Sequence, residues 1–130
     1  GIVKARLSWV WLFYIHHLRH LRFMDSILIV TTSLPKVEAA ETMAHQLIEH
    51  RLAACVQIQN GIHSVYRWDG KICDDAEVLL VAKTGSQKWL EIESFIKKNH
   101  PYQLPEIVAF TPSQCSHAYG TWVLEEVACD

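Results

Sequence analysis

The segment from His100 to Glu106 holds the side chains with the clearest chemical potential. Its sequence, His-Pro-Tyr-Gln-Leu-Pro-Glu, places an imidazole, a phenol and a carboxylate close together, and its two prolines restrict the backbone. Imidazole and carboxylate groups bind copper or zinc, and a phenol suits recognition of a polar ligand. We therefore predict a ligand site at His100, Tyr102 and Glu106, with His100 and Glu106 as metal ligands. The alternative is structural, with His100 ending a helix, Tyr102 packing at an interface and Glu106 pairing with a lysine.

Two more side chains are candidates for a site, and each has a structural alternative. Lys83 follows the apolar run Val78–Ala82, where it either contacts an anionic ligand or Glu106, or is a charged strand end in water. Cys55 either ligates a metal or packs in the interior, because free cysteine is among the most buried residue types. We include Lys83 as a ligand contact and Cys55 as a metal ligand in the predicted site.

The spacing of apolar residues predicts the elements that position these side chains. Apolar runs and period-two alternation predict strands at 26–32, 56–68, 71–84 and 106–111. A period near 3.6 predicts helices at 36–51 and 86–100, and a last helix with Ala118, Tyr119, Trp122 and Val123 on its apolar face. The order β-α-β-β-α-β plus a C-terminal helix predicts an α+β, ferredoxin-like sandwich, an antiparallel sheet with two helices on one face.

The middle hairpin is longer than such a domain needs. Asp69-Gly70 predicts a type I′ turn, whereas Asn60-Gly61 is either another turn or a bulge in one long bent strand. Both strands exceed the usual five or six residues, and long unpaired edges are normally protected. We therefore expect the hairpin to pair with other copies of the chain, with Tyr66 and Trp68 at the interface.

Composition narrows the class of protein. The chain has 130 residues, which fits one domain, and all 14 acidic residues but only 8 of the 12 basic ones follow residue 23. That acidic balance disfavours nucleic acid as a partner. No apolar run is long enough to cross a membrane, so we expect no membrane association for residues 24–130. The four cysteines form no C-x-x-C pair, which favours free thiols in a reducing compartment, the cytoplasm.

Residues 1–23 differ from the rest and have two interpretations. We favour an extension outside the fold, because no small-residue cleavage site follows the apolar run Leu7–Ile15. The alternative is a short helix that binds a membrane surface or a partner. The domain is then expected at 24–130 and should fold without this segment. His16 and His20 would share a helical face, but we assign them no role.

Several motifs in order resemble the CutA divalent-cation tolerance proteins, over Ser26 to about Val127. They are Leu52-Ala53-Ala54-Cys55-Val56, Tyr66-Arg67-Trp68-Asp69-Gly70-Lys71, Lys83-Thr84 and His100-Pro101-Tyr102-Gln103-Leu104-Pro105-Glu106-Ile107. The resemblance implies a homotrimer that joins the sheets of three subunits in a PII-like architecture. Copper binding is attributed to some members, and no catalytic mechanism is attached to the family. Members with a metal site are expected to carry a cysteine near the end of the first strand, where this chain has Thr31-Thr32, and a hydroxyl replaces a soft thiolate poorly.

The resemblance implies a binding or regulatory protein that responds to metal ions such as copper. The first alternative is a PII-like sensor of a small anionic ligand, bound at the subunit interface through Lys83 and Tyr102. The second is a hydrolase, since the acylphosphatases are enzymes that resemble this ferredoxin-like fold in topology. However, the signature motifs of common enzymes are missing from the sequence, and residues 31–36 contain neither the glycine nor the arginine of a phosphate loop. We therefore expect no enzymatic activity, and no cofactor other than a divalent metal such as copper or zinc.

Overall fold

The computed structural model describes residues 26–128. The predictions about residues 1–23, including His16 and His20, and the free thiol predicted at Cys129, lie outside the described residues.

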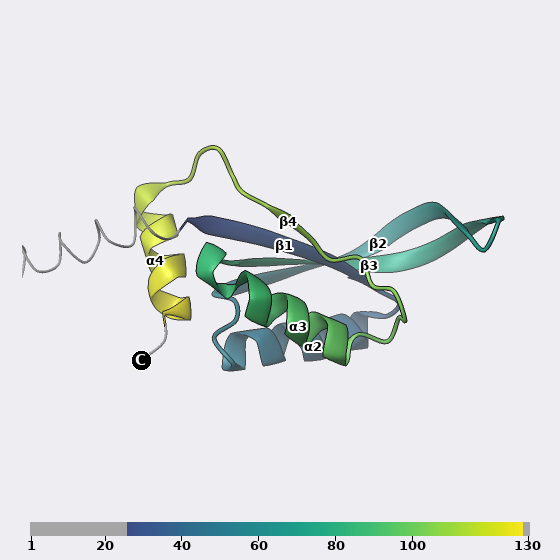
Figure 1. The fold of residues 1–130 in the computed structure, drawn as a ribbon, viewed down its shortest axis with the longest axis horizontal. Coiled ribbons are helices and arrows are strands. Elements are labelled where there is room, and N and C mark those ends of the chain that lie inside the picture. Colours follow the sequence, from purple (N-terminus) through teal and green to yellow (C-terminus); the bar gives the residue numbers. More distant parts are fainter. Residues whose placement is uncertain (1–25, 129–130) are drawn as a thin grey trace, which may run out of the picture.

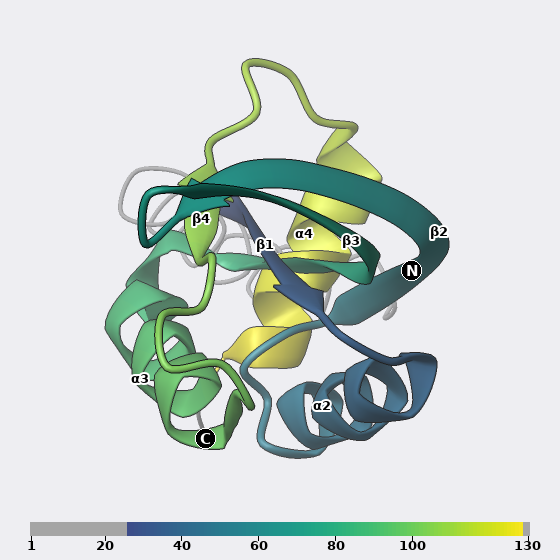
Figure 2. The same cartoon turned by 90° about the vertical axis from the view of Figure 1, so that its right-hand side faces the viewer.

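A four-stranded antiparallel sheet forms the centre of the fold (Figure 1). Its strands run in the order β2-β3-β1-β4, and helices α2 and α3 cover one face (Figure 2). This arrangement confirms the predicted ferredoxin-like sandwich with a C-terminal helix. The strands are β1 (Ile27–Leu34), β2 (Cys55–Trp68), β3 (Lys71–Gly85) and β4 (Val108–Phe110), and the helices are α2 (Val37–Glu49), α3 (Trp89–Asn99) and α4 (His117–Val127).

The core lies between the sheet and the two helices. Alternate residues of β1 point into it, and Leu28, Val30 and Leu34 are at most 8% exposed. The strand continues to Leu34, two residues further than predicted, so residues 31–34 are strand and only Pro35 and Lys36 separate it from α2. In α2 the predicted periodicity is present, with Ala40, Met43, Ala44 and Leu47 buried, whereas Ile48, which the same periodicity placed on the apolar face, is 43% exposed.

Of the predicted apolar face of helix α4, Val123 is buried, but Ala118, Tyr119 and Trp122 are exposed. The buried residues of the helix are Gly120, Val123, Leu124 and Val127, whereas Tyr119 and Trp122 are 39% and 42% exposed. The helix packs against β1 and β3, where Gly120 faces Ile27 and Leu124 lies close to Gly85. The face that meets the sheet is therefore the one with Gly120 and Leu124, and the aromatic residues lie outside it.

The β2–β3 hairpin extends well beyond the helices (Figure 1). Asp69 and Gly70 both have positive φ, 51° and 76°, as the predicted type I′ turn requires. At Asn60-Gly61 the structure has a bulge, because the pairing register shifts between Gln59 and Ile62 and Gly61 has φ 80°. We call residues 62–77, the part of the hairpin beyond this bulge, the arm.

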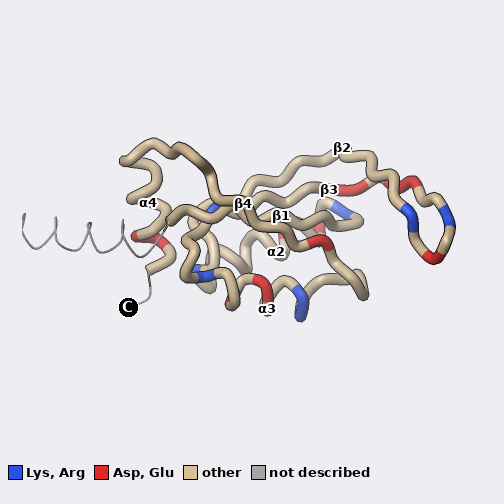
Figure 3. The backbone as a smooth tube through the Cα atoms, turned by 45° about the horizontal axis from the view of Figure 1, so that its top comes forward, with Lys and Arg blue, Asp and Glu red and all other residues tan. Residues whose placement is uncertain are grey.

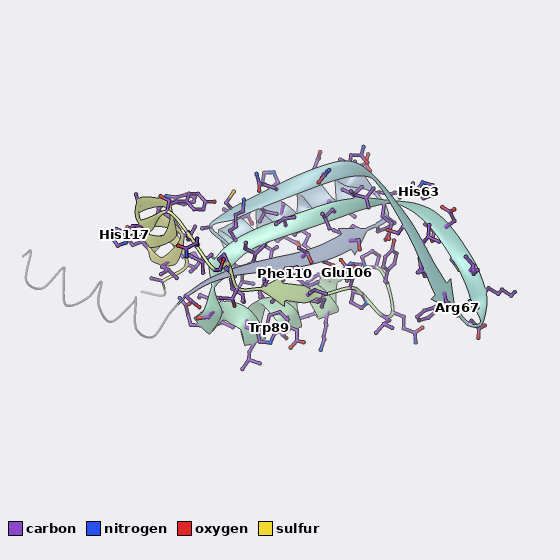
Figure 4. All side chains as sticks on the ribbon, turned by 90° about the horizontal axis from the view of Figure 1, so that it is seen from above. His63, Arg67, Trp89, Glu106, Phe110 and His117 are labelled. Carbon is purple, nitrogen blue, oxygen red and sulfur yellow. The ribbon has the colours of Figure 1, made fainter. Side chains whose placement is uncertain are left out.

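The second face of the sheet is not covered by α2 and α3. We call it the open face; its residues include Ile29 and Thr31 of β1, Leu79 and Val81 of β3, and Val108 and Phe110 of β4. Phe110 is 55% exposed. Figure 4 labels it on β4, the strand that pairs with β1. None of the helices within residues 26–128 is long and apolar enough to cross a membrane.

Candidate functional site

His100 is held by hydrogen bonds at both ring nitrogens. It follows the last residue of α3 and is 9% exposed. Its Nδ1 accepts the backbone N–H of Tyr102 at 3.1 Å, so the ring proton is on Nε2, which donates to the carbonyl of Ser33 at 2.8 Å. Burial lowers the pKa of His100 below its usual value, although the Ser33 bond and the charge of Glu77 act in the other direction. In this arrangement the imidazole is neutral, and neither nitrogen has a free lone pair for a metal ion.

Two tyrosines donate to carboxylates where the arm begins. The hydroxyl of Tyr102 donates to Glu77 at 2.8 Å, and that of Tyr66 donates to Asp75. Burial and the bond to Glu77 raise the pKa of Tyr102 above its usual value. The bond to Asp75 raises the pKa of Tyr66 to about 12. Both phenols therefore remain protonated donors at neutral pH.

Glu106 completes the predicted loop site. Its carboxylate accepts a long hydrogen bond, 3.4 Å, from the hydroxyl of Ser33. Ser33 thus binds both ends of the loop, through its carbonyl to His100 and through its hydroxyl to Glu106. The predicted set His100, Tyr102 and Glu106 is therefore gathered at the end of β1, and Figure 4 shows Glu106 in the segment leading to β4.

Lys83 and Cys55 lie at another part of the sheet. They face each other across β3 and β2, and Lys83 Nζ donates to Gln57. Lys83 lies six positions after Glu77 in β3, which is about 20 Å in an extended strand. Cys55 contacts Tyr119 of α4: burial, followed by a hydrogen bond and charge interaction with the Cys55 thiol, raises the pKa of Tyr119. Within one chain, Lys83 and Cys55 do not join the loop site.

Sequence reasoning missed the partners of the loop. Ser33 and Glu77 hold it, yet Ser33 lies in the sequence as one small polar residue among others. Glu77 carried a usable signal in the sequence, since it directly precedes the apolar run of β3. In the structure it is only 9% exposed. A buried carboxylate needs a donor, and a phenol is one that loop residues supply.

The electrostatic setting of the loop favours cations. Asp74 and Asp75 of the arm lie near Glu77, and Figure 3 shows the acidic positions gathered where the arm begins. Asp74 forms a side-chain hydrogen bond with His63. Negative charge around Tyr102 attracts a cation and repels an anion. Within residues 26–128, however, no three His, Cys, Asp or Glu side chains are grouped closely enough to hold a metal ion.

A shallow groove lies on the helical side of the molecule, away from these groups. It has a volume of about 570 Å³ and runs between the end of α2 and one side of α3. It shares no residue with the loop, and it contains no cluster of ionisable groups of one sign. Its lining residues are His50, Leu52, Leu90, Glu91, Ser94, Phe95 and Lys98.

Comparison with known proteins adds a family match. Residues 28–126 match the model of the CutA1 divalent ion tolerance protein family. The "Divalent-cation tolerance protein CutA" of Thermus thermophilus is 39% identical over 102 residues, which is 78% of this chain and 97% of that protein. The chloroplastic protein CutA of Arabidopsis thaliana is 35% identical over 74% of this chain, but this chain covers only 53% of its length.

Solved structures agree with the sequence matches. The structure described as the periplasmic divalent cation tolerance protein CutA from Archaeoglobus fulgidus superposes with a TM-score of 0.76 at 33% identity. The superposition covers 78% of this chain and 99% of that one. The similarity therefore includes the arrangement of the whole α+β domain described above.

Proposed function

Because the chain belongs to the CutA1 divalent ion tolerance protein family, we propose that it is a homotrimer that binds divalent metal ions such as copper or zinc in a regulatory role in metal tolerance. The proposal includes no catalysed reaction. The observation that carries it is the acidic, tyrosine-lined end of the sheet, where Glu106, Glu77 and Asp75 lie around the loop after α3. Hard and borderline divalent cations favour such oxygen-rich surroundings.

Exposed apolar side chains support assembly. On the arm and its turn, Val65, Trp68 and Ile72 are 65%, 52% and 71% exposed. On the open face Phe110 is 55% exposed. Apolar area of this kind is usually covered by a partner, and a closed ring of identical copies covers it in every subunit. We propose a PII-like trimer with Tyr66 and Trp68 at its interface.

Assembly also supplies what one chain lacks for a metal site. Glu106 is the proposed ligand, because within residues 26–128 its carboxylate makes only a long bond to Ser33. His100 joins the ligand set only if its ring gives up a backbone partner, since both nitrogens are engaged. Cys55 lies with Lys83 and reaches such a site only from a neighbouring subunit.

A PII-like sensor of a small anion is the second candidate in this proposal. It requires Lys83 and Tyr102 as contacts, and these come together only across a subunit boundary. Within one chain, Glu77 and Asp75 lie beside Tyr102 and disfavour an anion. We therefore place the anion second and use it as an outcome of the binding experiment.

The cytoplasm is the proposed location. Cys55, Cys73 and Cys115 are free thiols, which a reducing compartment preserves. The names of relatives include chloroplastic and periplasmic forms, so location varies within the family.

Calorimetry of the purified chain with Cu²⁺ and Zn²⁺ tests the binding function. We expect Glu106→Ala to weaken binding at least tenfold, because it removes a charged ligand. Glu49→Ala, which removes an exposed carboxylate from α2, is the matched control and leaves binding unchanged. Equal affinities of wild type and Glu106→Ala would overturn the role of Glu106. Thermal stabilisation by an organic anion with metals absent would favour the sensor instead.

Light scattering tests the assembly. We expect a trimer mass of about three times the 14.9 kDa of one chain. The mass of a single chain at micromolar concentration would contradict the proposed trimer. Trp68→Ala weakens assembly, since a buried aromatic commonly contributes ~2 kcal/mol or more to an interface. Lys71→Ala, next to the same turn, serves as the control with little effect.

A further inference from the structure

The arm leaves the sheet at a β-bulge. Between Gln59 and Ile62 the pairing of β2 with β3 shifts, and Gly61 within the shift has φ 80°. A bulge bends its strand and increases the local twist, so the direction of the arm depends on this position. On the opposite strand, the first pair beyond the shift joins Ile62 to Glu77.

Glu77 is also where the arm contacts the loop after α3. Its carboxylate, in a residue only 9% exposed, accepts the hydroxyl of Tyr102 at 2.8 Å. In the part of the chain that the structure describes, the other side-chain hydrogen bonds of the arm stay within the hairpin. They join His63 to Asp74, Tyr66 to Asp75, Arg67 to the carbonyl of Gly70 and the thiol of Cys73 to the carbonyl of Lys71.

The loop offers a rigid base for this contact. His100 binds the carbonyl of Ser33 through Nε2 and the N–H of Tyr102 through Nδ1. The rings of His100 and Tyr102 also lie 5.0 Å apart. The backbone of Tyr102 is therefore fixed to β1, while its hydroxyl reaches β3 at the base of the arm.

We propose that Tyr102 is a positioning residue whose bond to Glu77 sets the angle at which the arm leaves the sheet. A bulge permits a range of bends, and a hydrogen bond to a carboxylate at the same level selects one of them. Without the hydroxyl, the carboxylate turns toward water, because a buried charge without a donor is costly. The consequence for assembly rests on the proposed function: an arm held at a fixed angle loses little conformational freedom when it meets a second copy.

Residual dipolar couplings of the ¹⁵N-labelled full chain measure this angle. In the wild type, the amides of residues 62–75 and of 27–34 fit one common alignment. In Tyr102→Phe, which keeps the ring, the couplings of residues 62–75 shrink or fit a rotated orientation while those of 27–34 are unchanged. Glu77→Ala gives the same result from the other partner and replaces Tyr102→Phe if that variant does not fold.

Two controls separate positioning from general stability. Tyr66→Phe removes an equivalent phenol–carboxylate bond that lies wholly within the arm, so the arm keeps its orientation. Glu77→Gln keeps an acceptor for Tyr102 and also keeps the orientation. Wild-type couplings in both Tyr102→Phe and Glu77→Ala overturn the proposal, as does an equal change in Tyr66→Phe. Light scattering on the same samples tests the trimer independently, so failure of the two ideas is distinguishable.

Discussion

Nε2 of His100 donates a 2.8 Å hydrogen bond to the carbonyl of Ser33, a residue 67 positions earlier in the chain. Together with the bond from the N–H of Tyr102 to Nδ1, it fixes a neutral, buried imidazole between a strand and a loop. The most chemically suggestive residue of the sequence is thus a support for the loop that follows it.

This environment predicts a loss of stability in acid. The pKa of His100 is lower in the folded chain than in the unfolded one, where it is about 6.5, so the unfolded state binds the proton first. The contribution of neutral His100 to the free energy of unfolding is complete above about pH 6.5, the unfolded-state pKa, and decreases as the pH falls below it. Urea unfolding between pH 8 and pH 5 should show a smaller decrease in His100→Gln than in wild type. His45→Gln, at an exposed position, should follow wild type; if His100→Gln does so too, the prediction is wrong.

Two buried hydroxyls predict stabilising substitutions. In the described part of the chain, Thr32 and Thr84 are fully buried and their hydroxyl oxygens have no hydrogen-bond partner. Valine has nearly the same shape, suits a strand and buries no polar atom, so Thr32→Val should raise the free energy of unfolding by about 1 kcal/mol.

The neighbouring threonine provides a matched control for that measurement. Thr31 points to the open face and donates to the carbonyl of Val108 at 3.4 Å. Thr31→Val therefore gives no gain in a urea titration. A lower midpoint for Thr32→Val would mean that its hydroxyl has a partner, such as a buried water molecule.

The elements were predictable because each one carries a local signal. Period-two runs locate β2 and β3, and Asp69-Gly70 locates the turn between them. The helix α4 shows the limit of this reasoning. Large apolar residues suggested Tyr119 and Trp122 as part of its buried face, but packing against β1 and β3 buries the side with Gly120 and Leu124 instead. This contact joins elements that are distant in sequence, so the local pattern of α4 alone did not show which of its faces is buried.

For the candidate site, likewise, the sequence indicated the residues that are close together in the chain but not their distant partners. His100, Tyr102 and Glu106 are near one another in sequence, and the structure keeps them on one loop. Their partners are not local, since Glu77 lies 25 positions from Tyr102 and belongs to another element. The roles of such residues depend on which strand ends meet, and that is a property of the topology rather than of any motif.

Arg51 carries the last prediction, because it combines backbone strain with a tertiary contact. It follows α2 with φ 54°, and its Nη1 donates to the carbonyl of Glu126 in α4 at 2.8 Å. Arg51→Ala loses that bond and keeps the strained backbone, so it should destabilise the fold by about 1 kcal/mol. Arg51→Gly loses the same bond but relieves the strain, and should be more stable than Arg51→Ala by about 1 kcal/mol. Glu126→Ala keeps the carbonyl and removes only a carboxylate 3.8 Å from Arg51, an exposed pair of small value, so it should unfold as wild type does. Urea midpoints decide the order, and an alanine variant as stable as the glycine variant would show that the left-handed backbone of Arg51 carries no strain.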